Sequence, residues 1–188
     1  MRSFLAVLLL VVSAISVSAL AGILHANPPS PAPPQSPQSA ELKKLDAWTG
    51  QWTTTGKLYK TAYSPAGEIT ITMTCGWSAY NAYMICDHLF SGPRGKSDDI
   101  SIYTYYSTGK SYKFYNVDQS GTPRNTPMTI DGNIWTYSSE MEKDGKKIQI
   151  KTINDFSKPG TVTWNTKYSD DAGAHWTLMN EGVDTKVQ

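Results

Sequence analysis

The segment EITITMTCGWS, which runs from Glu68 to Ser78, alternates apolar and polar residues with a period of two. Side chains on a strand point to opposite faces in turn, so the alternation predicts a strand with one buried face and one wet face. The apolar face carries Ile69, Ile71, Met73, Cys75 and Trp77, and the polar face carries Thr70, Thr72, Thr74 and Ser78. The segment therefore predicts an antiparallel strand that covers a core.

The apolar run that follows predicts the partner of this strand, across a tight turn at Tyr80-Asn81. A register with Ala79 opposite Ala82 also sets Trp77 opposite Met84, Cys75 opposite Cys86, Met73 opposite His88 and Ile71 opposite Phe90. Opposed residues of an antiparallel pair lie close enough for a disulfide. In an exported chain, this register predicts a bridge between Cys75 and Cys86; the alternative is two free, buried thiols.

The rest of the body repeats the pattern between regularly spaced turn signals. In the segment 160–169, Val162, Trp164, Thr166 and Tyr168 share one face, and in 147–154, Ile148 and Ile150 do. Asp-Gly, Pro-Gly and similar pairs divide the chain into about ten strands without a helical crossover. Because closure removes exposed sheet edges, this meander predicts an all-β, antiparallel up-and-down barrel. Only Ser39–Trp48 reads as a helix, capped by Ser39 and leading into the barrel.

The amino-terminal region has the pattern of a targeting signal followed by a linker. Residues 1–21 combine a basic start, an apolar stretch and small residues suited to cleavage, and thus predict a signal peptide. Residues 22–39 are rich in proline and predict an extended tether. The remaining segment, 40–188, is long enough for one barrel domain. The chain is therefore expected to be secreted or periplasmic, without a membrane span in its mature form.

The charge balance argues against two classes of partner. The chain has 17 Lys and Arg and 16 Asp and Glu. Removal of the predicted leader takes away Arg2 and no acidic residue, so 17 − 1 basic residues meet 16 acidic ones. A neutral domain does not attract nucleic acid or anionic lipid through its net charge. The sequence leaves the oligomeric state open.

The stretch YSDDAGAHWT, Tyr168 to Thr177, has the spacing S-x-D-x-G-x-x-W, which resembles the Asp-box of sialidases. A sialidase propeller needs several such boxes and an arginine cluster, whereas this chain has one box, and only Arg94 and Arg124 outside the leader. Ser169, Asp171 and Gly173 therefore predict a structural turn, in which the carboxylate accepts from turn amides.

Histidine and carboxylate residues give only weak indications of chemistry. His88 is the one histidine on a predicted apolar face, where it could ligate haem iron. A small hydrolase-like enzyme would pair His88 with Asp87 or Asp98, but Asp87 alternates to the opposite face. Asp98 and Asp99 are interpreted as a loop pair without a partner. The sequence thus predicts no catalytic residue, no metal site and no cofactor, with haem on His88 as the alternative.

The stretch LDAWTGQWTTTG, Leu45 to Gly56, leads from a short helix into G-x-W, with Gly50 and Trp52 at the start of the first strand. Together with the Asp-box near the carboxyl end, it resembles a family of exported bacterial proteins of unknown function with lipocalin-like barrels. The resemblance implies a β-barrel with a small-molecule cavity and carries no catalytic residues. Haem-binding barrels of this type use G-x-W-x-G-x-G, and Thr54 departs from that pattern.

A barrel of this size is just wide enough to be filled by side chains or to hold one small ligand. The side chains expected to line the ligand cavity are Trp52, Met73, Trp77, Met84, His88, Trp135, Tyr137, Trp164, Tyr168 and Trp176. The sequence therefore favours an exported, non-catalytic barrel that binds a small apolar or amphipathic molecule. The alternatives are an envelope module that binds a protein partner, a haem-binding barrel and a small enzyme.

Overall fold

The computed structural model describes residues 38–187 and confirms the all-β barrel. The predicted signal peptide and nearly all of the predicted tether lie outside the described residues. The elements are α1 (Ala40–Lys44), η1 (Leu45–Trp48), β1 (Gly50–Leu58), β2 (Gly67–Trp77), β3 (Met84–Gly92), β4 (Gly95–Tyr106), β5 (Ser111–Asp118), β6 (Pro123–Asp131), β7 (Ile134–Lys143), β8 (Lys146–Lys158), β9 (Thr161–Ser169) and β10 (Thr177–Lys186). No helix within residues 38–187 combines the length and the apolar character that crossing a bilayer requires.

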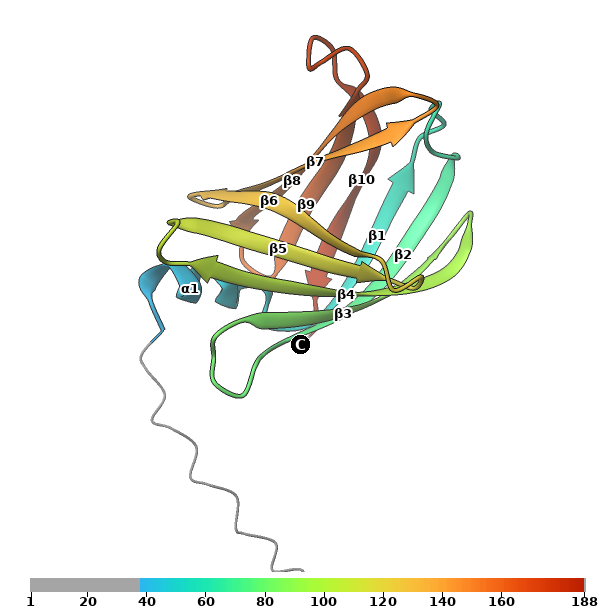
Figure 1. The fold of residues 1–188 in the computed structure, drawn as a ribbon. Coiled ribbons are helices and arrows are strands. Elements are labelled where there is room, and N and C mark those ends of the chain that lie inside the picture. Colours follow the sequence, from blue (N-terminus) through green and yellow to red (C-terminus); the bar gives the residue numbers. More distant parts are fainter. Residues whose placement is uncertain (1–37, 188) are drawn as a thin grey trace, which may run out of the picture. The chain divides into compact units, whose positions relative to one another are not determined.

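Each strand pairs antiparallel with the next one along the chain, and β10 returns to pair with β1 (Figure 1). The closing ladder runs from Trp52 opposite Lys186 to Leu58 opposite Asn180. Closure gives every strand two neighbours, so no strand is exposed along its whole length, which is the physical reason that a meander of alternating strands closes. Because consecutive strands run in opposite directions, successive loops lie at opposite ends of the barrel. The loops after β1, β3, β5, β7 and β9 therefore share one end, which is called here the mouth.

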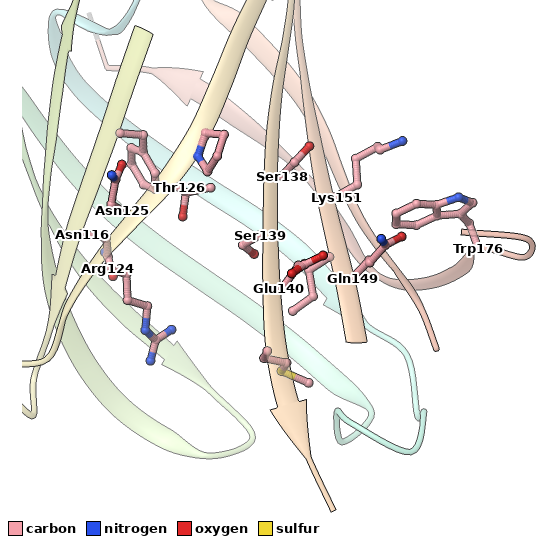
Figure 2. A pocket seen from close by; sticks show the side chains of 14 residues that line it. Asn116, Arg124, Asn125, Thr126, Ser138, Ser139, Glu140, Gln149, Lys151 and Trp176 are labelled. Carbon is pink, nitrogen blue, oxygen red and sulfur yellow. The ribbon is translucent and has the colours of Figure 1, made fainter. Parts of the chain in front are cut away.

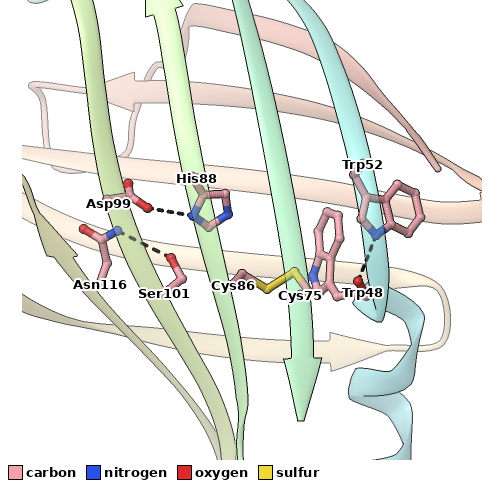
Figure 3. Close-up of a disulfide and its surroundings, with 8 residues drawn as sticks. All are labelled: Trp48, Trp52, Cys75, Cys86, His88, Asp99, Ser101 and Asn116. Atoms are coloured by element: carbon pink, nitrogen blue, oxygen red, sulfur yellow. Dashed lines mark hydrogen bonds and ion pairs between the residues drawn. A yellow bond between two sulfur atoms is a disulfide. The ribbon is translucent and has the colours of Figure 1, made fainter. Parts of the chain in front are cut away.

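The β2–β3 hairpin has the predicted register. Trp77 lies opposite Met84, and Cys75 lies opposite Cys86 with 4.1 Å between their Cα atoms. The two sulfur atoms form the predicted disulfide, and both cysteines are buried (Figure 3). The bridge therefore ties two wall strands together on the inner face of the barrel.

The end opposite the mouth is closed by the short helical segment. Ser39 caps α1 by accepting a hydrogen bond from the Leu42 amide at 3.2 Å, as the sequence predicted. The helix then tightens into the 3₁₀ turn η1, which buries Leu45 and Trp48. The Trp52 indole donates to the Trp48 carbonyl at 2.8 Å, which fixes η1 on the first strand (Figure 3). This end of the barrel is a packed aromatic core.

The mouth is crossed by the loop between β1 and β2, residues 59–66. Arg94 of the β3–β4 hairpin donates to the Tyr63 carbonyl at 3.0 Å, and Lys143 at the end of β7 donates to the Ala62 carbonyl at 3.4 Å. The Tyr63 ring packs edge-on against Tyr168 of β9, with 4.7 Å between the ring centroids. The loop therefore makes contacts on three sides of the rim, and a pocket of about 320 Å³ remains beside it at the mouth.

Candidate functional site

The interior of the barrel contains two adjoining cavities. The first, about 260 Å³, has Trp48 at its floor and Met73 and Trp164 in its walls. The second, about 250 Å³, is walled by Phe114 and Tyr137. Both cavities share the side chains of Tyr103, Thr152 and Asn154. The inward-facing residues thus leave a continuous hollow above the packed end, because they do not fill the wider half of the barrel.

Trp164 lies against a floor made by two inward-facing glycines. A Cβ atom on Gly182 would come within 2.5 Å of the Trp164 ring, and one on Gly56 within 3.1 Å. These two glycines face each other across the β1–β10 ladder. A side chain at either position would occupy the space of the indole, so the glycines explain why the ring can lie flat on the wall. The alternation of Trp164 with polar neighbours did not reveal this arrangement.

Asp184 is a buried carboxylate beside this indole. Its Oδ1 accepts hydrogen bonds from the Thr54 hydroxyl at 2.5 Å and from the Trp164 indole at 3.1 Å. Burial raises the pKa of the Asp184 carboxyl above its ordinary value, although the two hydrogen bonds and the nearby His88 oppose the rise. Desolvation dominates because a carboxylate loses more hydration on burial than two donors restore. Asp184 therefore brings a polar, titratable group into an otherwise aromatic cavity.

The raised pKa of Asp184 predicts how stability depends on pH. A carboxyl that holds its proton more tightly in the folded state stabilises the fold at low pH, and this contribution is lost as pH rises from about 4 through the folded pKa. The variant Asp184→Asn keeps an acceptor but cannot ionise. We therefore expect its free energy of unfolding, relative to the wild type, to increase from pH 3.5 to pH 7, by at most about 1.4 kcal/mol per pH unit.

Urea denaturation of both proteins across this pH range measures the difference directly, because titration of the groups that do not interact with Asp184 cancels. Thr54→Val serves as the matched variant, since it removes a donor that lowers the Asp184 pKa. In that protein the loss of stability should extend to higher pH. A difference between Asp184→Asn and the wild type that stays constant with pH would contradict the assignment.

His88 and Asp99 form a second polar group on the inner wall. The His88 Nδ1 and an Asp99 carboxylate oxygen are 2.7 Å apart, and both side chains are mostly buried (Figure 3). The interpretation of Asp98-Asp99 as a partnerless loop pair is wrong: both residues belong to β4, and Asp99 lies opposite His88 in the β3–β4 ladder. The β3–β4 turn is shorter than the sequence suggested, because β3 ends at Gly92 and β4 already begins at Gly95. Asp99 therefore occupies an inward position on β4 and does not lie in the loop. Asp98, like Asp87, alternates to the outer face.

Two tyrosine hydroxyls add to the polar lining. Burial raises the pKa of Tyr103 well above its ordinary value, and burial likewise raises that of Tyr137. Both phenols are therefore neutral donors at any physiological pH. Within residues 38–187, the Tyr137 hydroxyl and the Asn180 side-chain oxygen are buried without an aligned hydrogen-bond partner. Buried polar atoms of this kind are costly unless a water or a ligand satisfies them.

The side chains predicted to line the cavity fall into three groups. The first group faces the interior cavities and consists of Met73, His88, Tyr137 and Trp164. The second packs in the core at the closed end and consists of Trp52, Met84 and Trp135. The third lies near the barrel ends or outside the interior and consists of Trp77, Tyr168 and Trp176. Trp77 donates from its indole to Asp46 at 2.6 Å. Sequence alternation identified which side chains point inward, but not how far along the barrel axis each of them lies. It missed Tyr103, Asn154 and Asp184, which the same alternation places inward.

The Asp-box stretch forms a turn between β9 and β10. The Ser169 hydroxyl donates to Asp171 at 2.7 Å and accepts from the Gly173 amide at 2.8 Å. The Asp171 carboxylate also accepts from the His175 amide at 2.9 Å, and these hydrogen bonds hold its pKa well below the usual range. Gly173 adopts a φ of 92°, in the region that favours glycine. The Ser169 and Asp171 side chains thus make their hydrogen bonds within the turn.

Among the described residues, no group of three or more His, Cys, Asp or Glu side chains is placed to hold a metal ion. The candidate site is therefore the interior hollow with its aromatic walls, the His88–Asp99 pair and the buried Asp184.

These features define the class of protein: a lipocalin-like β-barrel with an interior cavity. Two solved structures share this fold. Rv2717c from M. tuberculosis matches with a TM-score of 0.53 and 9% identity, over 81% of this chain and 100% of that one. The S-type phycobiliprotein lyase CPES from Guillardia theta matches with a TM-score of 0.51 and 11% identity, over 80% of this chain and 94% of that one. No protein-family profile and no curated protein matches the sequence.

Proposed function

We propose that this protein is an exported, non-catalytic barrel that holds one small amphipathic molecule, without a cofactor. The observation that carries the proposal is the interior hollow, whose walls combine aromatic and methionine side chains with a few convergent polar groups. Such a lining is typical of small-molecule sites. The disulfide and the predicted signal peptide support export, since structural disulfides belong to oxidising compartments.

The polar groups inside specify what the ligand must offer. Asn180 has a buried side-chain oxygen without an aligned partner, so a bound molecule with a hydrogen-bond donor satisfies it. The first cavity alone, at about 260 Å³, exceeds the roughly 150 Å³ that holds a benzene ring. An apolar body of one or two rings, or a folded alkyl chain, therefore fits, and burial of its surface drives binding.

A second candidate function is catalysis on a small bound molecule. The observation that favours it is the His88–Asp99 pair, because a carboxylate on Nδ1 orients an imidazole as a general base. The likeness to a phycobiliprotein lyase is a further reason to test it. In that case, His88→Gln and Asp99→Asn would abolish turnover while leaving ligand binding intact.

Native mass spectrometry of the purified protein, followed by titration with 1-aminoanthracene, octyl glucoside, oleate and haemin, tests the proposal. We expect one-to-one binding of 1-aminoanthracene at micromolar concentration. The affinity should fall in Trp164→Phe and remain unchanged in Trp77→Phe, because of these two indoles only that of Trp164 lines the cavity. Absence of any bound molecule and of any binding among the four probes would refute the proposal. A haemin absorption shift that is lost in His88→Ala would replace it with the haem alternative.

A further inference from the structure

The wall of the barrel is incomplete between β6 and β7. Their ladder contains the pairs from Asp131–Ile134 to Met128–Tyr137 and stops there. On either side, the β5–β6 ladder continues to Pro123 and the β7–β8 ladder continues to Lys143. The two strands diverge from their shared hairpin toward the mouth (Figure 1). Residues 123–127 of β6 and 138–143 of β7 are thus not paired with each other, although each stretch pairs with its other neighbour. The opening between them is called here the lateral slot.

The sequence explains where the pairing stops. The turn Gly132-Asn133 joins β6 and β7, so the flanking residues Asp131 and Ile134 form a hydrogen-bonded pair. Along an antiparallel ladder, hydrogen-bonded pairs alternate with non-hydrogen-bonded pairs. After Asp131–Ile134, the hydrogen-bonded positions are therefore Thr129–Thr136 and then Pro127–Ser138. Pro127 has no N–H to donate, and the ladder ends one residue before it. The slot is therefore encoded by a proline on the edge of β6.

The slot opens into the interior. A groove of about 1000 Å³ lies over it and is lined from both strands (Figure 2). Phe114, Thr126 and Ser139 line this groove and also the second interior cavity. These three side chains therefore form a neck between the outer groove and the hollow. The mouth offers a second possible route: a pocket of about 320 Å³ beside the loop 59–66 shares Ile69, Phe90 and Asn180 with the first interior cavity. Arg94 and Lys143 tether that loop.

Two of the three charged side chains that line the slot have a partner of opposite charge within the protein, and the third, Lys151, has an aromatic partner instead. Arg124 pairs with Asp118 at 2.8 Å and Glu140 pairs with Lys147 at 2.6 Å. The ammonium of Lys151 lies over the Trp176 ring at 4.4 Å. The groups that remain are uncharged: within residues 38–187, the side chains of Asn125, Ser138, Ser139 and Gln149 make no hydrogen bond to the protein. Such a rim offers hydrogen bonds mainly to hydroxyl or amide groups, with Lys151 as a cation held over the Trp176 ring.

We propose that the lateral slot is the portal and outer subsite for a non-ionic amphipathic ligand. Its apolar part passes the neck into the hollow, and its uncharged, hydroxyl- or amide-bearing head stays on the rim, hydrogen-bonded to the free amide and hydroxyl side chains. This inference rests on the proposed function, because a portal requires a ligand in the interior.

A covalent bridge across the slot tests the route. Asn125 and Glu140 are exposed and would face each other if the ladder continued, so Asn125→Cys/Glu140→Cys treated with dibromobimane closes the slot from outside. Both native cysteines are in the disulfide and do not react. We expect the association rate of 1-aminoanthracene, measured by stopped-flow fluorescence, to fall at least tenfold relative to the same double variant before it is bridged. The matched control is Glu142→Cys/Lys147→Cys, bridged across the intact β7–β8 ladder, which should leave the rate unchanged.

Releasing the loop over the mouth gives the opposite test. Arg94→Ala removes its hydrogen bond to Tyr63 and should leave the association rate unchanged if ligands enter through the slot. A bridged slot with normal rates, or faster binding in Arg94→Ala, would overturn the portal while leaving the proposed function standing. Failure of the wild type to bind 1-aminoanthracene at all would remove the proposed function and this inference with it.

The rim chemistry is tested by competition with three eight-carbon amphiphiles below their micellar concentrations. Octyl glucoside should displace 1-aminoanthracene at least tenfold more effectively than octanoate or octyltrimethylammonium. Asn125→Leu/Gln149→Leu should reduce this preference, because it removes two uncharged partners of the head without touching the hollow. Equal or stronger competition by either ion would overturn the assignment of a non-ionic head.

Discussion

Replacing Trp48 by alanine is expected to lower the free energy of unfolding by about 3–5 kcal/mol. Trp48 is 3% exposed and meets Trp52, Trp135 and Phe156 edge-on, with centroids 5.4, 6.3 and 4.8 Å away. Its loss enlarges the cavity whose floor it forms, and the neighbouring rings on separate strands cannot collapse into the space. Urea denaturation followed by circular dichroism measures the effect.

Trp176→Ala is the matched control for this variant. Trp176 is only half-buried, in the loop between β9 and β10, and its recorded ring contact is with Lys151. Its removal should cost less than about 1 kcal/mol, the scale of an exposed cation–π contact. If Trp48→Ala lost no more stability than Trp176→Ala, the helical segment would not be the structural plug of the barrel.

Removing the disulfide with Cys75→Ala/Cys86→Ala is expected to lower the free energy of unfolding by about 2–3 kcal/mol. The bridge closes a loop with a sequence separation of 11, so it restricts the unfolded chain less than a long-range crosslink would. Alanine is the suitable replacement, because serine would place two hydroxyls in a buried site without assured partners. The β2–β3 ladder should persist, since eight backbone pairs hold it.

Two measurements check this prediction. Thiol titration of the unfolded wild type without reductant should find no free thiol, and the urea midpoint of the wild type should fall to that of the double variant once reductant is added. An unchanged midpoint after confirmed reduction of Cys75 and Cys86 would show that the bridge contributes nothing to stability.

The two effects act at different places in the folding equilibrium. The Trp48 variant acts on the folded state, whereas the disulfide variant acts mainly on the unfolded chain. The disulfide variant leaves the interior lining around His88 and Asp184 in place, whereas the Trp48 variant removes the floor of that cavity. Without urea, the disulfide variant should therefore still bind 1-aminoanthracene. The same titration measures this.

Much of the fold follows from short-range features of the sequence. Period-two alternation and the turn residues at intervals along the chain determined ten strands in meander order, and the register of the turn at Tyr80-Asn81 determined the Cys75–Cys86 pairing. Ser39 marked the start of the helix. These features involve residues that are near neighbours along the chain or across one hairpin, so their pairing needs no knowledge of the rest of the barrel.

The site depended on what the closed barrel brings together. Asp184 meets Thr54 only because the last strand returns to the first, and Asp99 meets His88 only because β4 begins earlier than its turn residues suggested. Height along the barrel separated packed tryptophans such as Trp135 from cavity-lining ones such as Trp164, although both alternate inward. Barrel closure and the stagger between strands determine how far along the axis each side chain lies. A local sequence pattern contains no information on either of them. Pro127 stands in the sequence, but only the paired barrel shows that it opens the wall.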